Sequence, residues 1–301
     1  MSSEKRKPKI LHFSPVRKPA KIVKLHCISL NALKLNDFDF TYSFFDDNID
    51  LCSSEILREF KNCNENTLIF KDKDLKLISD YRGKKRWTIE LYDRITTIKD
   101  FIIEYFVLSE YDYLFLSDSD LLIHPETIIN LYSHKKKFIS EVFWTNFEGR
   151  PTYFPNAWYS GNNGFKNKDQ LIEIRDKSII EVDYTGACTL LSREILESNV
   201  RFKKIPNLSN NFLGEDKHFC IRAHVNNYKI FLNTESPAFH IYNNSLIDKG
   251  QLFIESGFDN KFLYKDWLDD TWEKCLDDYF TNSKLSRISY SKRIFNYFFQ
   301  L

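Results

Sequence analysis

The stretch from Asp112 to Pro125 constrains the fold more than any other part of the chain. It reads Asp-Tyr-Leu-Phe-Leu-Ser-Asp-Ser-Asp-Leu-Leu-Ile-His-Pro, so the apolar run from Tyr113 to Leu116 is followed at once by polar residues. A short apolar run that ends abruptly predicts a buried strand of a parallel sheet. In open α/β sheets, ligands bind beyond the carboxyl ends of the strands. The sequence therefore predicts an α/β fold with a site directly after residue 116.

Two aspartates separated by one serine follow this strand. Because side chains alternate along an extended chain, Asp118 and Asp120 project in the same direction. Two neighbouring carboxylates repel each other unless a cation lies between them. Their oxygen ligands suit Mg²⁺ or Mn²⁺, so the pair predicts half of a divalent-metal site. The alternative is a solvated turn or the N-cap of a helix beginning at Leu121, since aspartate caps helices well.

A strand, Asp-x-Asp, apolar residues and then proline resembles the signature of GT-A-type, nucleotide-sugar-dependent glycosyltransferases. The nearest resemblance is to family 2 and its bacterial relatives. It extends over residues 9–242, with specific motifs at 113–125, 184–193 and 214–222. It implies a GT-A (Rossmann-like) α/β fold with a mixed, mostly parallel central sheet flanked by helices. In that family the motif holds the metal that bridges the donor's diphosphate.

Composition limits the size of the fold, the classes of ligand and the cellular compartment that we expect. The chain has 301 residues, 43% of them hydrophobic, which is enough for one large α/β domain or two small ones. A formal net charge of +1 argues against a nucleic-acid partner, and the 8 glycines form no phosphate-binding or dinucleotide motif. The six cysteines form no CxxC pair, and the N-terminus has no apolar signal region. We therefore expect a soluble, reduced, cytoplasmic protein.

Donor contacts are expected from several separate segments. In the resembling family the turn after the first strand meets the nucleotide, and an acidic residue after the second strand meets the base or ribose. A basic residue on the helix before the metal-binding strand faces the diphosphate, and a Gly-Ala pair lines the sugar pocket. An aromatic strand end adds a surface on which a sugar could stack. The donor-binding candidates are Ser14, Arg17, Asp46, Asp47, Arg94, Lys99, Asp118, Ser119, Trp144, Gly186 and Ala187. The structural alternatives for the candidates outside the metal-binding motif are a turn, a helix cap, a surface basic residue, a core tryptophan or a strand bend.

The Glu215-Asp216 pair precedes a predicted helix. Acidic residues at a helix start are stabilised by the helix dipole, which is the purely structural explanation. In the resembling family a Glu-Asp pair before a helix supplies the catalytic base of inverting enzymes, and Asp216 matches that position best, with Glu215 beside it. The dipole lowers the pKa of an aspartate, whereas burial and a neighbouring carboxylate raise it. The residue types alone therefore leave the role open.

His240 follows a predicted strand over residues 229–232 and resembles the third metal ligand of many GT-A enzymes, beside Asp118 and Asp120. A structural histidine is the alternative. The expected organisation is a disordered basic tail (1–8), a catalytic domain (9–242, with its nucleotide-binding half at 9–125 and its acceptor half at 126–242) and a helical extension (243–301). Segment 284–301 mixes basic and aromatic residues. It is expected to pack on the core, bind a partner or touch the inner face of a membrane.

The expected function is metal-dependent transfer of a sugar from a nucleoside-diphosphate sugar, with UDP as the expected nucleotide. The acceptor is a hydroxyl of a glycan, peptide or small molecule, and the expected outcome is inversion. A sugar nucleotidyltransferase is the first alternative, although it would normally carry a Gly-rich loop after the first strand. A phosphatase with Asp118 as nucleophile and a non-catalytic carbohydrate- or partner-binding module are the others.

Overall fold

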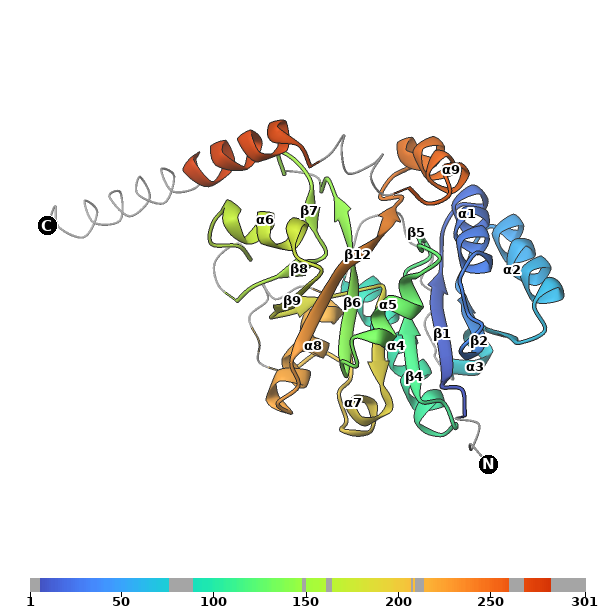
Figure 1. Cartoon of the computed structure of the whole chain (residues 1–301). Coiled ribbons are helices and arrows are strands. Elements are labelled where there is room, and N and C mark those ends of the chain that lie inside the picture. The colour runs from blue at the N-terminus through green and yellow to red at the C-terminus, as the bar shows by residue number, and fades with distance from the viewer. Residues whose placement is uncertain are drawn as a thin grey trace, which may run out of the picture.

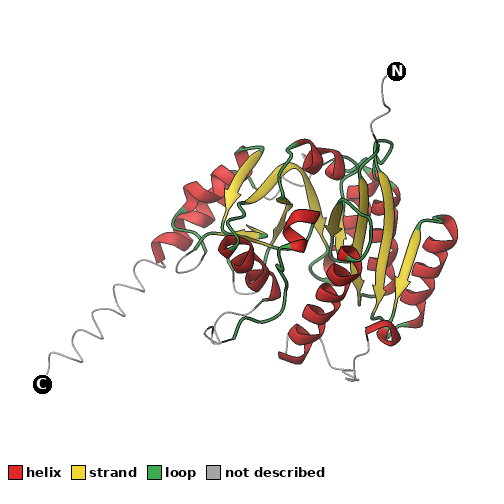
Figure 2. Ribbon diagram, turned by 90° about the horizontal axis from the view of Figure 1, so that it is seen from below, coloured by secondary structure: helices red, strands yellow, loops and turns green. Residues whose placement is uncertain are grey.

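A mixed sheet forms the centre of the protein, and helices cover both of its faces (Figure 1 and Figure 2). The computed structural model describes residues 6–75, 89–147, 150–160, 164–206, 208, 214–259 and 268–282. In order across the sheet, the strands are β3 (Thr67–Phe70), β2 (Asp39–Asp46), β1 (Lys9–Val16), β4 (Tyr113–Leu116), β11 (Thr189–Ser192), β6 (Phe138–Thr145), β12 (Ile230–His240) and β5 (Leu121–Leu122). The short strands β7 (Phe154–Pro155) and β9 (Ile179–Val182) pair with β6 and β12, and β8 (Ala157–Trp158) pairs with β10 (Tyr184–Thr185).

Strand direction determines where the site lies. Strands β3, β2, β1 and β4 are parallel, and β6 and β12 run the same way on the far side of the reversed β11. This confirms the mixed, mostly parallel sheet expected from the sequence. Because these six strands share one direction, their carboxyl ends meet at one edge of the sheet. The segments that follow β1, β2, β4 and β12 therefore all start along that edge.

Two helical layers enclose the sheet. Helices α1 (Ala20–Asn31), α2 (Leu51–Cys63) and α5 (Thr127–Ser133) pack on one face. Helices α4 (Ile89–Val107), α6 (Lys168–Asp176), α7 (Arg193–Glu197) and α8 (Glu215–Val225) pack on the other. In β1, Leu11 and Phe13 enter the second layer while Ile10 and Val16 enter the first. Burial on both faces explains why the central strands are almost continuously apolar.

The residues directly after the Asp-x-Asp motif form a strand and not the helix that was the structural alternative for this motif. Leu121 and Leu122 form β5, which pairs with His240 and Phe239 of β12, so a helix beginning at Leu121 is wrong. Strand β12 is also much longer than the predicted 229–232. Its register with β6 shifts between Asn233 and Ala238, a segment that contains Pro237, which has no amide hydrogen for the ladder. The strand continues beyond this irregularity and carries His240 to the edge of the sheet.

Residues after β12 form helices that pack on the rest of the protein. The short helix η1 (Asn244–Leu246) leads into α9 (Ile247–Glu255), which packs against α1. Earlier in the chain, the short helix α3 (Asp72–Leu75) precedes α4. A further helix over residues 270–282 inserts Trp272, whose Nε1 donates to the carbonyl of Tyr153 at 3.0 Å. None of the described helices combines the length and apolar composition that a bilayer crossing needs. Segment 284–301 lies outside the described residues.

Candidate active site

The Asp-x-Asp motif occupies the carboxyl edge of the sheet between β4 and β5. Asp120 is buried, and its Oδ2 lies 3.5 Å from Nε2 of His240. The ammonium of Lys18, from the segment between β1 and α1, contacts the same oxygen. Asp118 is half-buried and lines a pocket that it shares with Asp216. Within the described part of the chain, no three acidic, histidine or cysteine side chains are grouped closely enough to form a preassembled metal site.

The positions of Asp120 and His240 nevertheless suit a divalent cation. Two ligands each about 2.1 Å from one ion are about 3 to 3.5 Å apart, and the Asp120–His240 separation of 3.5 Å agrees with this. Nδ1 of His240 pairs with Oγ1 of Thr145 at 2.7 Å, which directs Nε2 towards Asp120. A hydrogen bond on the other ring nitrogen is typical of metal-binding histidines. The Lys18 ammonium contacts the same Oδ2 oxygen of Asp120.

The surroundings move the pKa values of the two aspartates in opposite directions. Burial acts to raise the pKa of Asp120, but the charges of Lys18 and His240 outweigh it and hold that pKa well below its ordinary value. Burial raises the pKa of Asp118, with Lys99 acting against the rise and Asp120 adding to it. Asp120 is therefore firmly ionised, and a further positive charge would favour the ionised form of Asp118.

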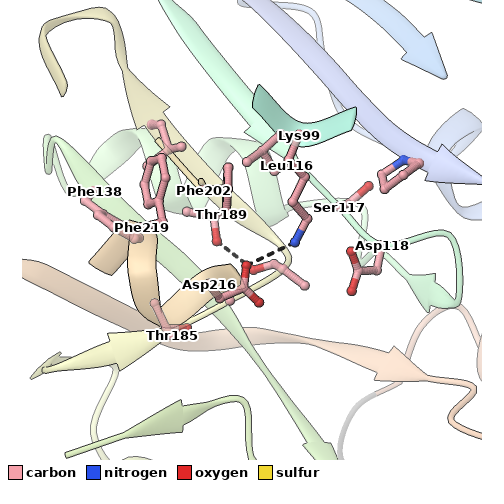
Figure 3. Close-up of a pocket in the computed structure, with 14 residues that line it drawn as sticks. Lys99, Leu116, Ser117, Asp118, Phe138, Thr185, Thr189, Phe202, Asp216 and Phe219 are labelled. Atoms are coloured by element: carbon pink, nitrogen blue, oxygen red, sulfur yellow. Dashed lines mark hydrogen bonds and ion pairs between the residues drawn. The ribbon is translucent and has the colours of Figure 1, made fainter. Parts of the chain in front are cut away.

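Lys99 of α4 joins the two acidic residues at the start of α8. Its side chain is 4% exposed, and its Nζ lies 2.8 Å from Oε1 of Glu215. The same Nζ lies 3.0 Å from Oδ1 of Asp216, a contact drawn in Figure 3. Burial raises the pKa of Asp216 to about 7, although Lys99 acts to lower it. This is the pKa range in which a general base works efficiently at neutral pH. Lys99 also lines the pocket, where both acids engage its ammonium, and its contact with donor phosphates stays a prediction.

Gly186 packs directly against the carboxylate of Asp216. A Cβ at this position would lie 2.0 Å from Oδ2 of Asp216, so only glycine fits beside that side chain. The next residues, Ala187 and Cys188, have φ values of 52° and 44°, which are uncommon for residues other than glycine. Asn156 supports the turn by donating to the carbonyl of Gly186 at 3.0 Å. The backbone here is thus shaped around Asp216 and the pocket.

Replacing Gly186 by alanine should displace the Asp216 carboxylate, because the new methyl group would occupy its space. We expect activity to fall about 10- to 100-fold, the loss expected when a reacting group is misplaced by about 1 Å. Gly250→Ala is the control: its Cβ would meet flexible methyl groups of Ile241 and Leu122 at 3.0 and 3.1 Å, away from the pocket. Initial rates and melting temperatures of both variants separate the effects. Equal rates for the two variants would contradict the packing argument.

The donor candidates after β2 form a charged cluster. Arg94 donates from Nε to Oδ1 of Asp47 at 3.0 Å and from Nη2 to Oδ1 of Asp72 at 2.6 Å. Nη1 of Arg17 lies 3.3 Å from Oδ2 of Asp47. Arg94 is only 7% exposed. Arg94, the residue predicted to bind the diphosphate, therefore pairs with Asp47, a residue predicted to bind the nucleotide.

Asp46 is held on the neighbouring side by local partners. Its Oδ1 accepts from Oγ of Ser54 at 2.8 Å and Nδ2 of Asn48 at 2.9 Å, and its Oδ2 lies 3.1 Å from the Lys71 ammonium. Burial acts to raise the pKa of Asp46, but these partners together lower it. Asp46 therefore fastens the start of α2 to the end of β2.

Two predicted ligand contacts are wrong because the side chains are buried away from the pocket. Trp144 is 3% exposed and packs edge to face against Trp272 with ring centres 5.6 Å apart, so it belongs to the core. Ser14 is fully buried, and its Oγ pairs with Nε2 of His26 at 3.2 Å. Nδ1 of His26 in turn lies 2.6 Å from the carbonyl oxygen of Leu121. Ser14 thus supports the loop that carries the aspartates rather than a ligand.

The fold also brings to the site residues that were not predicted from the sequence. Lys18, Asn156 and His26 are three such residues, and each contacts a segment of the site. Ser119, a predicted donor contact, is 2% exposed between the two aspartates. A lysine directly before Pro19 at a helix start was the available signal for Lys18. Asn156 and His26 lie in a loop and on an apolar helix face, where no local pattern marks them.

Known structures share this fold at low sequence identity. No family model and no curated protein matches the sequence. The mannosyltransferase PcManGT from Pyrobaculum calidifontis, in complex with GDP-Man and Mn²⁺, matches with a TM-score of 0.52 and 12% identity, over 79% of this chain and 58% of that one. The crystal structure of S. aureus TarS matches with a TM-score of 0.50 and 14% identity, over 77% of this chain and 36% of that one. The chain thus spans less than two thirds of either structure, and the likeness shows a shared GT-A-like α/β fold.

Proposed function

We propose that this protein is a metal-dependent glycosyltransferase that moves a sugar from a nucleoside-diphosphate sugar to an acceptor hydroxyl. The observation that carries the proposal is that Asp118, from the Asp-x-Asp motif, and Asp216, from the start of α8, line one pocket. A carboxylate with its pKa near 7 thus lies beside a carboxylate suited to a cation. The mannosyltransferase of the same fold binds GDP-Man and Mn²⁺, which supports this class of donor.

Each side chain then has a distinct role. Asp118, Asp120 and His240 would hold Mn²⁺ or Mg²⁺, which when bound offsets the negative charge of the leaving nucleoside diphosphate. Lys99, which Glu215 also binds, holds the Asp216 carboxylate in position. Asp216 accepts the proton of the acceptor hydroxyl while that oxygen attacks the anomeric carbon and the bond from that carbon to the diphosphate breaks.

Inversion follows from this assignment, and two further features of the structure agree with it. Attack opposite the leaving group inverts the anomeric configuration, and a single carboxylate acting as base is sufficient for such a displacement. Gly186 and Ala187 expose backbone at the pocket wall, where a sugar can approach closely. The charged cluster of Arg17, Asp47 and Arg94 lies beyond β2 and supplies groups for the nucleotide. UDP is the nucleotide we expect, and GDP is the comparison that the mannosyltransferase suggests.

Thermal unfolding with UDP or GDP, with and without Mn²⁺, tests the proposal. One nucleotide should raise the melting temperature by several degrees only when Mn²⁺ is present, because a ligand that binds the folded state stabilises it. Asp118→Asn should abolish this increase. Asp248→Asn is the matched control, since Asp248 is exposed in the first turn of α9. Stabilisation that is independent of Mn²⁺, or unchanged in Asp118→Asn, would contradict metal-dependent donor binding.

A further inference from the structure

Lys18 occupies the place at which a cation would meet Asp120. Its ammonium contacts Oδ2 of Asp120, the same oxygen that lies 3.5 Å from Nε2 of His240. A divalent ion bound between these two groups would repel an ammonium at contact distance. Lys18 must therefore leave Asp120 before an ion can bind there.

The backbone of Lys18 is anchored, whereas its side chain has room to move. Its N–H donates to Oδ1 of Asn48 at 3.2 Å, and its carbonyl accepts from Oγ of Ser53 at 2.8 Å. Pro19 follows and forms the N-cap position of α1. The side chain is 36% exposed and carries its charge on a flexible four-carbon stem. The ammonium can thus swing about a fixed Cα without disturbing the loop.

Three other basic groups among the described residues at this edge are bound to acids outside the proposed metal ligands. Arg17 and Arg94 contact Asp47, and Lys99 contacts the acidic pair at the start of α8. Binding of a metal ion at Asp120 would displace none of these pairs directly. It would displace Lys18, whose charge then needs a new negative partner, since Asp120 would be neutralised by the ion.

We propose that Lys18 is a tethered cation that neutralises Asp120 in the metal-free protein and moves to the donor's diphosphate when a metal ion takes its place. This inference rests on the proposed function, from which it takes the diphosphate. A diphosphate bound to an ion at Asp120 would present its oxygens beside the position that the ammonium vacates. Lysine suits such an exchange because it binds phosphate as a point charge rather than through a fixed fork of donors.

The exchange predicts effects of opposite sign in Lys18→Met. Mn²⁺ alone should bind about tenfold more tightly, because removal of a competing internal cation raises the fraction of protein that is ready to bind. UDP or GDP, added at saturating Mn²⁺, should bind about tenfold more weakly, the scale of one lost charge-assisted contact. Free Mn²⁺ is measured by electron paramagnetic resonance and nucleotide binding by calorimetry. Lys21→Met is the matched control, because it removes the same charge from an exposed position on α1 and should change neither affinity.

The outcomes separate this inference from the proposed function. Equal Mn²⁺ affinity in the wild type and Lys18→Met would overturn the inference while leaving metal-dependent transfer intact. Mn²⁺ binding to none of the proteins would overturn both. Tighter Mn²⁺ binding with unchanged nucleotide binding would overturn the proposed movement to the diphosphate.

A stability measurement keeps the test valid if Lys18→Met weakens the fold. Without metal, Lys18→Met should lower the melting temperature, because Asp120 is 6% exposed and would lose its counter-charge. Mn²⁺ should restore it. In an Asp120→Asn background the same substitution should have no effect, since the pair is already absent. An equal loss in both backgrounds would show that Lys18 acts through something other than Asp120 and would overturn the inference.

Discussion

Replacing Asp216 by asparagine should lower the rate of sugar transfer by about three orders of magnitude, within the range that a positioned general base contributes. Asparagine retains the size of the side chain but cannot accept the proton of the acceptor hydroxyl. Nucleotide binding with Mn²⁺ should be unchanged, because Asp216 is not among the proposed metal ligands. Initial rates at saturating donor, together with calorimetry, separate the two properties.

Asp248→Asn is the control for this experiment, since it makes the same chemical change in the exposed first turn of another helix. Its transfer rate should equal that of the wild type. An Asp216→Asn enzyme that retains the wild-type rate would remove Asp216 from the reaction and, with it, the explanation for inversion.

The pH dependence of the rate provides a second signature of Asp216. Burial raises its pKa to about 7, so wild-type activity should increase as the pH rises through about 7 and the carboxylate becomes ionised. Glu215 adds to that rise in the pKa of Asp216. Glu215→Gln should therefore move the increase in activity to lower pH. A shift to higher pH would contradict this electrostatic description.

Substitution of Lys99 by methionine should destabilise the protein by about 3 to 5 kcal/mol, the usual cost of removing one partner from a buried ion pair. The ammonium is 4% exposed and is hydrogen-bonded to both Glu215 and Asp216. Burial acts to lower the pKa of Lys99, but the acids raise it well above its ordinary value. As far as titration of Lys99 itself is concerned, the stabilisation is fully present below the ordinary lysine pKa and is lost as the pH rises through the higher folded-state value. Protonation of Asp216, whose pKa is about 7, separately weakens the pair at low pH.

Urea unfolding at pH 5 and pH 8 measures the effect of Lys99→Met. The deficit should be smaller at pH 5, because Asp216 can then be neutralised by a proton in the variant. Lys137→Met is the matched control: the 2.6 Å ion pair of Lys137 with Glu194 is more than half exposed on both sides, and such pairs contribute little. Equal stabilities of the two variants would contradict a structural role for the buried pair.

Parts of the site were predictable because their signals are local. The apolar run of β4 followed by two aspartates indicates both a buried strand and a polar edge, and β4 begins and ends where the sequence predicted. The acidic pair was placed at the start of a helix, and α8 begins at Glu215. The position of His240 at the site results from a strand that is longer than predicted. The full length of β12 was not predicted because its irregularity interrupts the alternating pattern that marks a strand.

The sequence by itself determined the buried strand β4, the polar residues that follow it and the acidic pair at the start of α8, since these depend on neighbours within a few positions. Only the tertiary structure decided which charges meet. Lys18 and Asp120 are 102 residues apart, and Lys99 and Asp216 are 117 apart. Their pairing depends on how α1, α4 and α8 pack against the sheet. The same packing buries Trp144 against Trp272, because side-chain burial is set by layers that assemble from distant segments.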